Sequence, residues 1–383
     1  MSGKKTLVLV DFDYNDKISW YSNTTDQFKF KFFGLNFNNF FEKYFNFEIY
    51  DEQKTYDKDC IFVILDIYNK KKFSDKYPTY LKLHDQGYKI ILWMLPEFPG
   101  THFHRFFNPL NSPIPIFYIP HWFWFQELGS SVDPFLSTSE KIVLTPHEYP
   151  KNKTYEFLAL VPMNKPRNHR DQLFNRLSSL KNDILLSYVT RGLTLPRNEL
   201  YESDINPYYV KVLDPLVDPG VEIINDRYFN PDWYNNTYFS IVVETCIEKY
   251  EYPVFLTEKT WKPIKYKHPF VIWGQPGSLA YLKELGFETY ENLFDESYDL
   301  NENPHQRLQT IISNVKNFRK QYYRRHTAPI TYYRSSIYKK QTYDKLTQDK
   351  IEYNYNLFFN SDILNERLYT DIVVPMYKFS ESN

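Results

Sequence analysis

The stretch YFSIVVETCIEKYEYPVFLTEKTWKPIKYKHPFVIWGQPG, residues 238–277, decides the fold of this chain. Its β-branched run at 239–243 predicts a buried strand that ends at Glu244. Thr257 stands where an N-cap is expected, directly before a helix. A second apolar run at 269–273 is closed by Gly-Gln-Pro-Gly, which is turn-forming sequence. Two strands joined through a helix predict a βαβ unit and therefore a parallel sheet.

The carboxyl edge of this predicted sheet carries polar residues suited to a nucleotide. In open α/β sheets, ligands bind outside the carboxyl ends of the strands, often with an anion at a helix N-terminus. We expect Glu244, Glu258, Lys259 and the turn at Gly274 to meet at that edge. A carboxylate there suits ribose hydroxyls, and a cation with helix amides suits a diphosphate. The stretch therefore predicts a sugar-nucleotide site, the simpler alternative being an ordinary capped helix in a βαβ unit.

The order of these features resembles the donor-binding segment of the α-1,3-fucosyltransferase family. In that family the first strand ends in Phe-Glu-Asn, and a Thr-Glu-Lys segment grips the nucleotide and diphosphate. Here residues 243–245 read Val-Glu-Thr, so the Asn is absent, while residues 257–259 read Thr-Glu-Lys. The resemblance covers residues 238–277 and implies a GT-B fold, in which two Rossmann-like α/β domains face each other across a cleft. It implies donor-binding roles for Glu244, Thr257, Glu258 and Lys259.

Length and composition suit two domains. The 383 residues are 42% hydrophobic, enough for two cores. We expect an N-terminal Rossmann-like acceptor domain at 1–150 and a C-terminal Rossmann-like donor domain at 151–330. A C-terminal extension at 331–383 follows, in which residues 368–374 are available to cross back to the first domain.

Further apolar runs extend the βαβ rhythm along the chain. Strands are expected at 6–10, 60–67, 89–95 and 114–119, and then at 155–161 and 184–190. Aromatic residues at 37–47 predict a short helix, and further helices are expected at 278–285 and 305–325. A short strand is expected at 287–290. Strands that alternate with helical segments favour parallel sheets in both domains.

Glu97 follows the predicted strand at 89–95, on a loop stiffened by Pro96 and Pro99. In the resembled family the catalytic base is a Glu at an equivalent place, after a strand and shortly before a Pro. The resemblance therefore implies that Glu97 is the general base. The alternative is a solvated loop carboxylate.

Beyond Glu97, the candidates for lining the acceptor cleft are His102, His104 and Trp122. The two histidines have the spacing of metal ligands on a strand, but no third ligand follows at a familiar spacing, so no metal is expected. Trp122 opens the aromatic run at 122–125, which either stacks against sugar rings or belongs to the core.

An arginine is expected to contact the donor diphosphate. The resemblance places one near the end of the strand predicted at 184–190, where Arg191 is the candidate. Arg167 and Arg227 compete for this role, and the sequence alone does not choose among them.

Composition indicates which partners and which cellular compartment to expect. The net charge is −1, so no global basic field demands nucleic acid or an anionic membrane. Cys60 and Cys246 lie in or beside apolar segments and are expected as buried free thiols. No apolar run reaches transmembrane length, which predicts a cytoplasmic protein. Abundant Lys, Asn, Tyr, Phe and Ile are typical of AT-rich genomes, including those of viruses and phages.

The resulting expectation is an inverting, metal-independent glycosyltransferase with no cofactor. It would move a sugar from a nucleoside-diphosphate sugar, such as a GDP-fucose-like donor, to a hydroxyl of a glycan acceptor. Two alternatives stay open. In the first, the acceptor is a base in modified DNA, which the basic residues interleaved with tyrosines at 314–326 and 331–340 favour. In the second, the chain is a non-catalytic binding protein on the same scaffold. The oligomeric state is left open.

Overall fold

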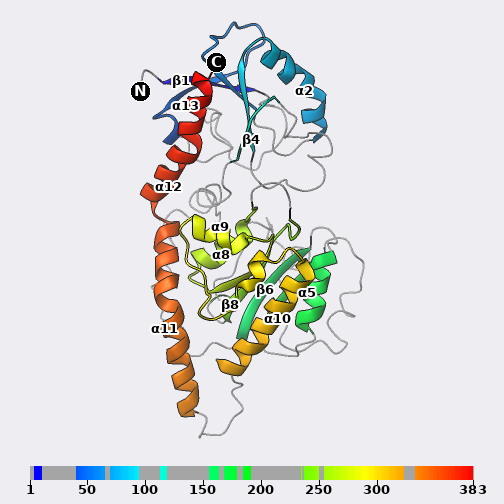
Figure 1. Ribbon diagram of the computed structural model, residues 1–383, viewed down its shortest axis with the longest axis vertical. Coiled ribbons are helices and arrows are strands. Elements are labelled where there is room, and N and C mark those ends of the chain that lie inside the picture. Colours follow the sequence, from blue (N-terminus) through cyan, green and yellow to red (C-terminus); the bar gives the residue numbers. More distant parts are fainter. Residues whose placement is uncertain are drawn as a thin grey trace, which may run out of the picture. The chain divides into compact units, whose positions relative to one another are not determined.

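The protein is described from a computed structural model, which describes residues 4–10, 40–64, 70–94, 113–118, 155–163, 168–178, 184–190, 234, 237–249, 254–322 and 333–382. The chain divides into two compact units (Figure 1). Unit 1 comprises Met1–Ser137 and Asn360–Asn383, and unit 2 comprises Thr138–Phe359. The domain limits 1–150, 151–330 and 331–383 stay a prediction.

Unit 1 contains a parallel sheet of five strands in the order β2-β1-β3-β4-β5. The strands are β1 (Lys5–Val10), β2 (Phe45–Ile49), β3 (Ile61–Ile64), β4 (Lys89–Met94) and β5 (Ile116–Tyr118). Helix α2 (Lys70–Asp85) joins β3 to β4. The strands β1, β3 and β4 are near-continuous apolar runs, as expected where both faces of a parallel sheet are covered. The predicted α/β class with parallel sheets is confirmed in this unit.

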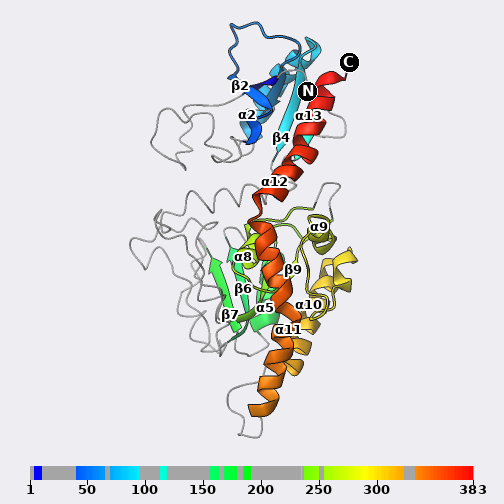
Figure 2. The same cartoon turned by 90° about the vertical axis from the view of Figure 1, so that its left-hand side faces the viewer.

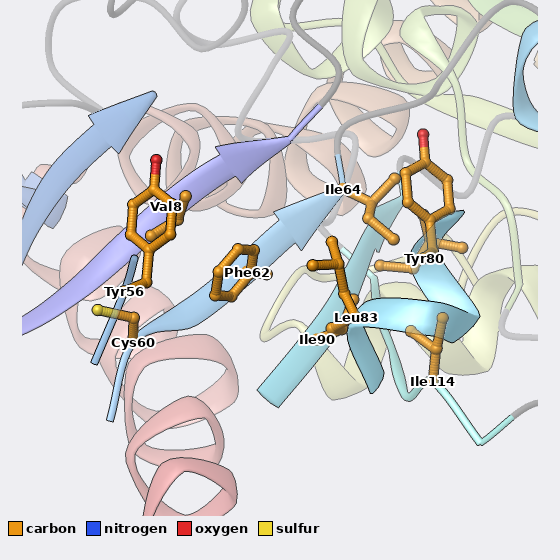
Figure 3. Packing of buried hydrophobic residues seen from close by; sticks show 10 residues of the cluster. Val8, Tyr56, Cys60, Phe62, Ile64, Tyr80, Leu83, Ile90 and Ile114 are labelled. Atoms are coloured by element: carbon orange, nitrogen blue, oxygen red, sulfur yellow. The ribbon is translucent and has the colours of Figure 1, made fainter. Parts of the chain in front are cut away.

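The core of unit 1 is formed by β3, β4 and α2 (Figure 3). Phe62 and Ile64 of β3 are buried with Ile90 and Leu92 of β4. Cys60 is a buried free thiol, as predicted, and burial raises the pKa of this thiol. A rigid α/β core therefore supports the carboxyl end of β4, which Glu97 follows in the sequence.

The expected helix at 37–47 is wrong for residues 42–47. Within the described residues 40–47, Phe40 and Phe41 are helical, a turn follows at 42–44, and β2 begins at Phe45. The sequence FNFEI alternates apolar and polar residues, and Phe45 is 1% exposed whereas Asn46 is exposed. This period of two belongs to a strand and outweighs the helical spacing of the preceding aromatics.

The C-terminal segment of unit 1 is helical. It comprises α12 (Ser361–Leu368), a π-helical turn η4 (Tyr369–Val373) and α13 (Val374–Glu381). The Tyr377 hydroxyl donates to the Tyr44 carbonyl at 2.7 Å, and Lys89 Nζ donates to the Ser382 carbonyl at 2.8 Å. The C-terminal residues of the chain therefore contact Tyr44 and Lys89 in the N-terminal segment of unit 1.

Unit 2 contains a parallel sheet of four strands in the order β7-β6-β8-β9. The strands are β6 (Tyr155–Met163), β7 (Ile184–Thr190), β8 (Thr237–Val243) and β9 (Phe270–Trp273). The helical elements are α5 (Asn168–Ser178), α8 (Glu258–Lys265), α9 (Ser278–Glu284), the 3-10 turn η2 (Ser297–Leu300), α10 (Pro304–Gln321) and α11 (Tyr333–Phe358). Since β7 and β8 flank β6 on opposite sides, the winding reverses between β6 and β8, which is a topological switch point.

The short strand expected at 287–290 is absent. The N–H of Glu288 donates to Asn354 Oδ1 at 2.7 Å, and the Glu288 carbonyl accepts from Asn354 Nδ2 at 2.8 Å. A side chain of α11 thus takes the hydrogen bonds that a neighbouring strand would have made. Helix α11, which runs along unit 2 (Figure 2), is also joined to it by an ion pair between Lys267 and Glu352, with Nζ to Oε2 at 2.7 Å.

Candidate functional site

The carboxyl ends of β8 and β9 lie side by side in unit 2. Val243 pairs with Trp273 in register, and the Glu244 N–H donates to the Trp273 carbonyl at 3.0 Å. Glu244 and Gly274 therefore follow on neighbouring strands at the same edge. A Cβ at Gly274 would lie 2.7 Å from Ser278 Oγ and 3.3 Å from Glu244 Cγ, so a larger residue would force these side chains to shift.

The Glu244 carboxylate is fully buried and hydrogen-bonded to the start of α8. Its Oε1 accepts from the Thr257 N–H at 3.0 Å and from Thr260 Oγ1 at 2.6 Å. Its Oε2 accepts from Thr257 Oγ1 at 2.7 Å and from the Thr245 N–H at 3.3 Å. Glu244 is 0% exposed, and its carboxylate is hydrogen-bonded to the N-terminus of α8. Its predicted contact with a nucleoside stays a prediction.

The first turn of α8 combines amide groups with a cation. Thr257 is the N-cap, as the sequence predicts, and its Oγ1 accepts from the Lys259 N–H at 3.3 Å. Lys259 Nζ donates to the same oxygen at 3.1 Å. Glu258 is the first residue of the helix. The dipole of a helix attracts anions to its N-terminus, and the half-buried Lys259 adds a full positive charge.

Two side chains, those of Gln275 and Asp299, hold the turn after β9 and the start of the helix that follows it. Gln275 Oε1 accepts the Phe255 N–H at 2.8 Å, which ties this turn to the segment before α8. Asp299 accepts the N–H groups of Leu279 and Ala280 at 2.9 and 3.0 Å and so caps α9. Burial raises the pKa of Asp299, against the opposing effect of these N–H donors. The edge beside α8 is therefore rigidly held.

Arg307 of α10 is a buried arginine that the sequence analysis does not single out. Its side chain is 1% exposed and donates to the carbonyls of Gly274 at 3.1 Å and Asn301 at 2.5 Å, and also to that of Ile247. Desolvation lowers its pKa. It thereby ties together the loops after β8 and β9. Helical periodicity could have found it, because Arg307 precedes Ile311 by one helical turn on the buried face.

Several predicted site residues lie outside the described part of the chain: Glu97, His102, His104, Trp122 and Arg191, with the competing Arg167 and Arg227. Arg191 directly follows β7 in the sequence. Their roles stay predictions. Among the described residues, the structure brings together Glu244, Thr257 and Lys259, and it contains no group of three or more His, Cys, Asp or Glu residues placed to hold a metal ion.

Comparison with known proteins gives one distant likeness. No protein-family model matches the chain, and no curated protein matches it. A solved structure titled "Crystal Structure of alpha1,3-Fucosyltransferase" is similar over 91% of this chain and 91% of that one, with 11% identity and a TM-score of 0.40. At this level the similarity concerns the fold and assigns neither substrate nor mechanism. Within the described ranges, no helix combines the length and apolar character needed to span a membrane.

Proposed function

We propose that this protein is a glycosyltransferase that uses a nucleoside-diphosphate sugar, with the donor diphosphate bound at the N-terminus of α8. The observation that carries the proposal is the first turn of α8, where the Lys259 ammonium donates to the N-cap hydroxyl of Thr257 beside the tightly packed turn that begins at Gly274. A diphosphate is the anion that such a place in an α/β unit commonly binds.

The donor and acceptor roles follow the sequence predictions. Lys259 and Arg191 neutralise the diphosphate, while Glu258 holds the ribose hydroxyls. Unit 1 supplies the acceptor side, with His102, His104 and Trp122 lining a cleft for a glycan hydroxyl. This division of labour requires the two α/β units to form a GT-B arrangement, which is part of the proposal.

The proposed reaction is a single inverting displacement. The acceptor oxygen forms a bond to the anomeric carbon as the bond from that carbon to the diphosphate oxygen breaks. The bonding pair leaves with the diphosphate, and the acceptor proton passes to Glu97 as general base. Lys259 and the arginine stabilise the developing negative charge in place of a divalent metal.

The test is nucleotide binding in the absence of metal. Thermal shift and titration calorimetry with GDP, UDP, ADP and CDP, each with and without a chelator, should give one preferred nucleotide whose affinity survives chelation. Lys259→Ala should weaken that affinity. The matched control is Lys249→Ala in the same unit, since Lys249 is exposed and pairs with Glu302. If none of the four nucleotides binds, the proposed function is wrong. If a nucleotide binds only with Mg²⁺ or Mn²⁺, the metal-free mechanism is wrong.

Turnover is measured separately across a panel of sugar nucleotides, with hydrolysis as the readout. A transferase that lacks its acceptor often releases the sugar slowly to water, so a preferred donor should give detectable hydrolysis. Nucleotide binding without hydrolysis or transfer for any donor would favour a non-catalytic binding protein on the same scaffold.

A further inference from the structure

Glu244 is a buried carboxylate whose hydrogen-bond donors, in the portion of the chain that the structure describes, are all neutral. Three of its hydrogen bonds come from the start of α8: the Thr257 N–H, the Thr257 hydroxyl and the Thr260 hydroxyl. Burying a carboxyl group costs free energy that its hydrogen bonds must offset. A threonine N-cap alone is enough to begin a helix. The three hydrogen bonds that join Glu244 to the start of α8 therefore point to a role beyond capping.

The direction of the Thr257 hydroxyl supplies that role. A hydroxyl has one proton to donate and two lone pairs that accept. Because Glu244 Oε2 accepts the proton at 2.7 Å, the lone pairs of Thr257 Oγ1 face its other partners. Those partners are the Lys259 N–H at 3.3 Å and Lys259 Nζ at 3.1 Å. Glu244 thus orients the hydroxyl on which the ammonium of Lys259 rests.

Given the function proposed above, on which this step rests, we propose that Glu244 is a positioning residue of the diphosphate site. It acts through Thr257 on Lys259 and on the first amides of α8, and it does not touch the donor. Its burial at 0% exposure fits this role and does not fit a direct contact with ribose. Preorganised donors of this kind stabilise charge without the cost of reorienting at the moment of reaction.

Replacement of Glu244 by glutamine separates the two roles. The side chain keeps its size, but its Nε2 is a donor, so the atom facing Thr257 Oγ1 no longer accepts the hydroxyl proton. The hydroxyl must then accept from the amide and turn its own proton toward Lys259. The ammonium loses Thr257 Oγ1 as an acceptor, while the positioning role leaves contacts of the protein with the nucleoside intact.

The experiment measures the affinity of the parent and of Glu244→Gln for two fragments of the donor: inorganic pyrophosphate, and the nucleoside of whichever nucleoside diphosphate the parent prefers. A positioning role predicts about tenfold weaker binding of pyrophosphate and of the nucleoside diphosphate, with nucleoside affinity within about twofold. With an active donor, kcat should fall by up to about 10²-fold, the effect of a small misplacement of a catalytic group.

Four further variants guard against a purely structural explanation. Thr257→Val removes the hydroxyl and should reproduce the effect of Glu244→Gln, whereas Thr257→Ser retains it and should restore pyrophosphate affinity. The double variant Glu244→Gln/Thr257→Val should be no worse than either single variant, because both break one relay. Asn314→Ala, which removes a buried link to the backbone of Asp295, is the destabilised control and should leave affinity unchanged.

The outcomes separate this proposal from the proposed function. If the parent protein binds neither pyrophosphate nor any nucleoside diphosphate, the proposed function and the positioning role of Glu244 are both wrong. Normal pyrophosphate binding by folded Glu244→Gln, with nucleoside affinity lost, would make Glu244 a direct ribose contact and overturn the positioning role alone. If Glu244→Gln does not fold, equal pyrophosphate affinity in Thr257→Val and Thr257→Ser would overturn it instead.

Discussion

The side chain of Asn354 forms two hydrogen bonds with the backbone of a single residue, Glu288, accepting its N–H at 2.7 Å and donating to its carbonyl at 2.8 Å. Asn354 is 1% exposed, and both hydrogen bonds are part-buried. Its removal breaks both bonds at once. At about 0.5–1.5 kcal/mol for each bond, we expect Asn354→Ala to lower the free energy of unfolding by about 1–3 kcal/mol.

Urea unfolding of the two proteins checks this value. Tyr353→Ala is the control on the same helix, since Tyr353 is 51% exposed and should change stability by about 0.5 kcal/mol or less. Equal stability of both variants would mean that water or another group replaces the asparagine.

Arg307→Lys keeps the positive charge but removes the planar fork that reaches three carbonyls. Lysine cannot contact the Gly274, Asn301 and Ile247 carbonyls with the same geometry, so we expect a loss of about 1.5–3 kcal/mol in the free energy of unfolding. Arg319→Lys, near the end of the same helix, is the matched control. Comparable losses in the two variants would show that the fork contributes nothing specific.

Glu97→Gln tests the proposed base. The amide cannot take the acceptor proton, so turnover should fall by about 10²–10⁴-fold, while the affinity for the nucleoside diphosphate should stay close to that of the parent. Steady-state kinetics with calorimetric binding measure both. Unchanged turnover in a folded variant would return Glu97 to the class of solvated loop carboxylates.

Asp299 predicts a pH dependence of stability. Burial raises the pKa of this carboxyl, which therefore holds its proton more tightly in the folded than in the unfolded state. The resulting stabilisation is full below the unfolded pKa of about 3.9 and is lost as the pH rises through the folded pKa. The difference in unfolding free energy between the parent and Asp299→Asn should therefore grow in favour of the parent as the pH falls from 7 toward 4. A constant or shrinking difference would contradict this.

The sheets could be predicted from the sequence because their strands are apolar runs bounded by polar turns. The run ending at Glu244 and the N-cap at Thr257 are local signals, and both features are present in the structure. The pairing of Glu244 with Thr260 could not be predicted, because a carboxylate at a strand end reads the same whether it faces a ligand or its own helix. The hydrogen bonds of Asn354 could not be predicted either, because their partner, Glu288, lies far away in the sequence.

The C-terminal helices of unit 1 have a consequence for how the protein is made. Unit 2 is one uninterrupted segment, Thr138–Phe359, whereas unit 1 needs both Met1–Ser137 and Asn360–Asn383. During synthesis, the residues that pack on Tyr44 and Lys89 are added only after the whole of unit 2 has been made. Unit 1 therefore cannot complete its packing as soon as its own first segment is made, which departs from the usual order in which N-terminal domains fold first.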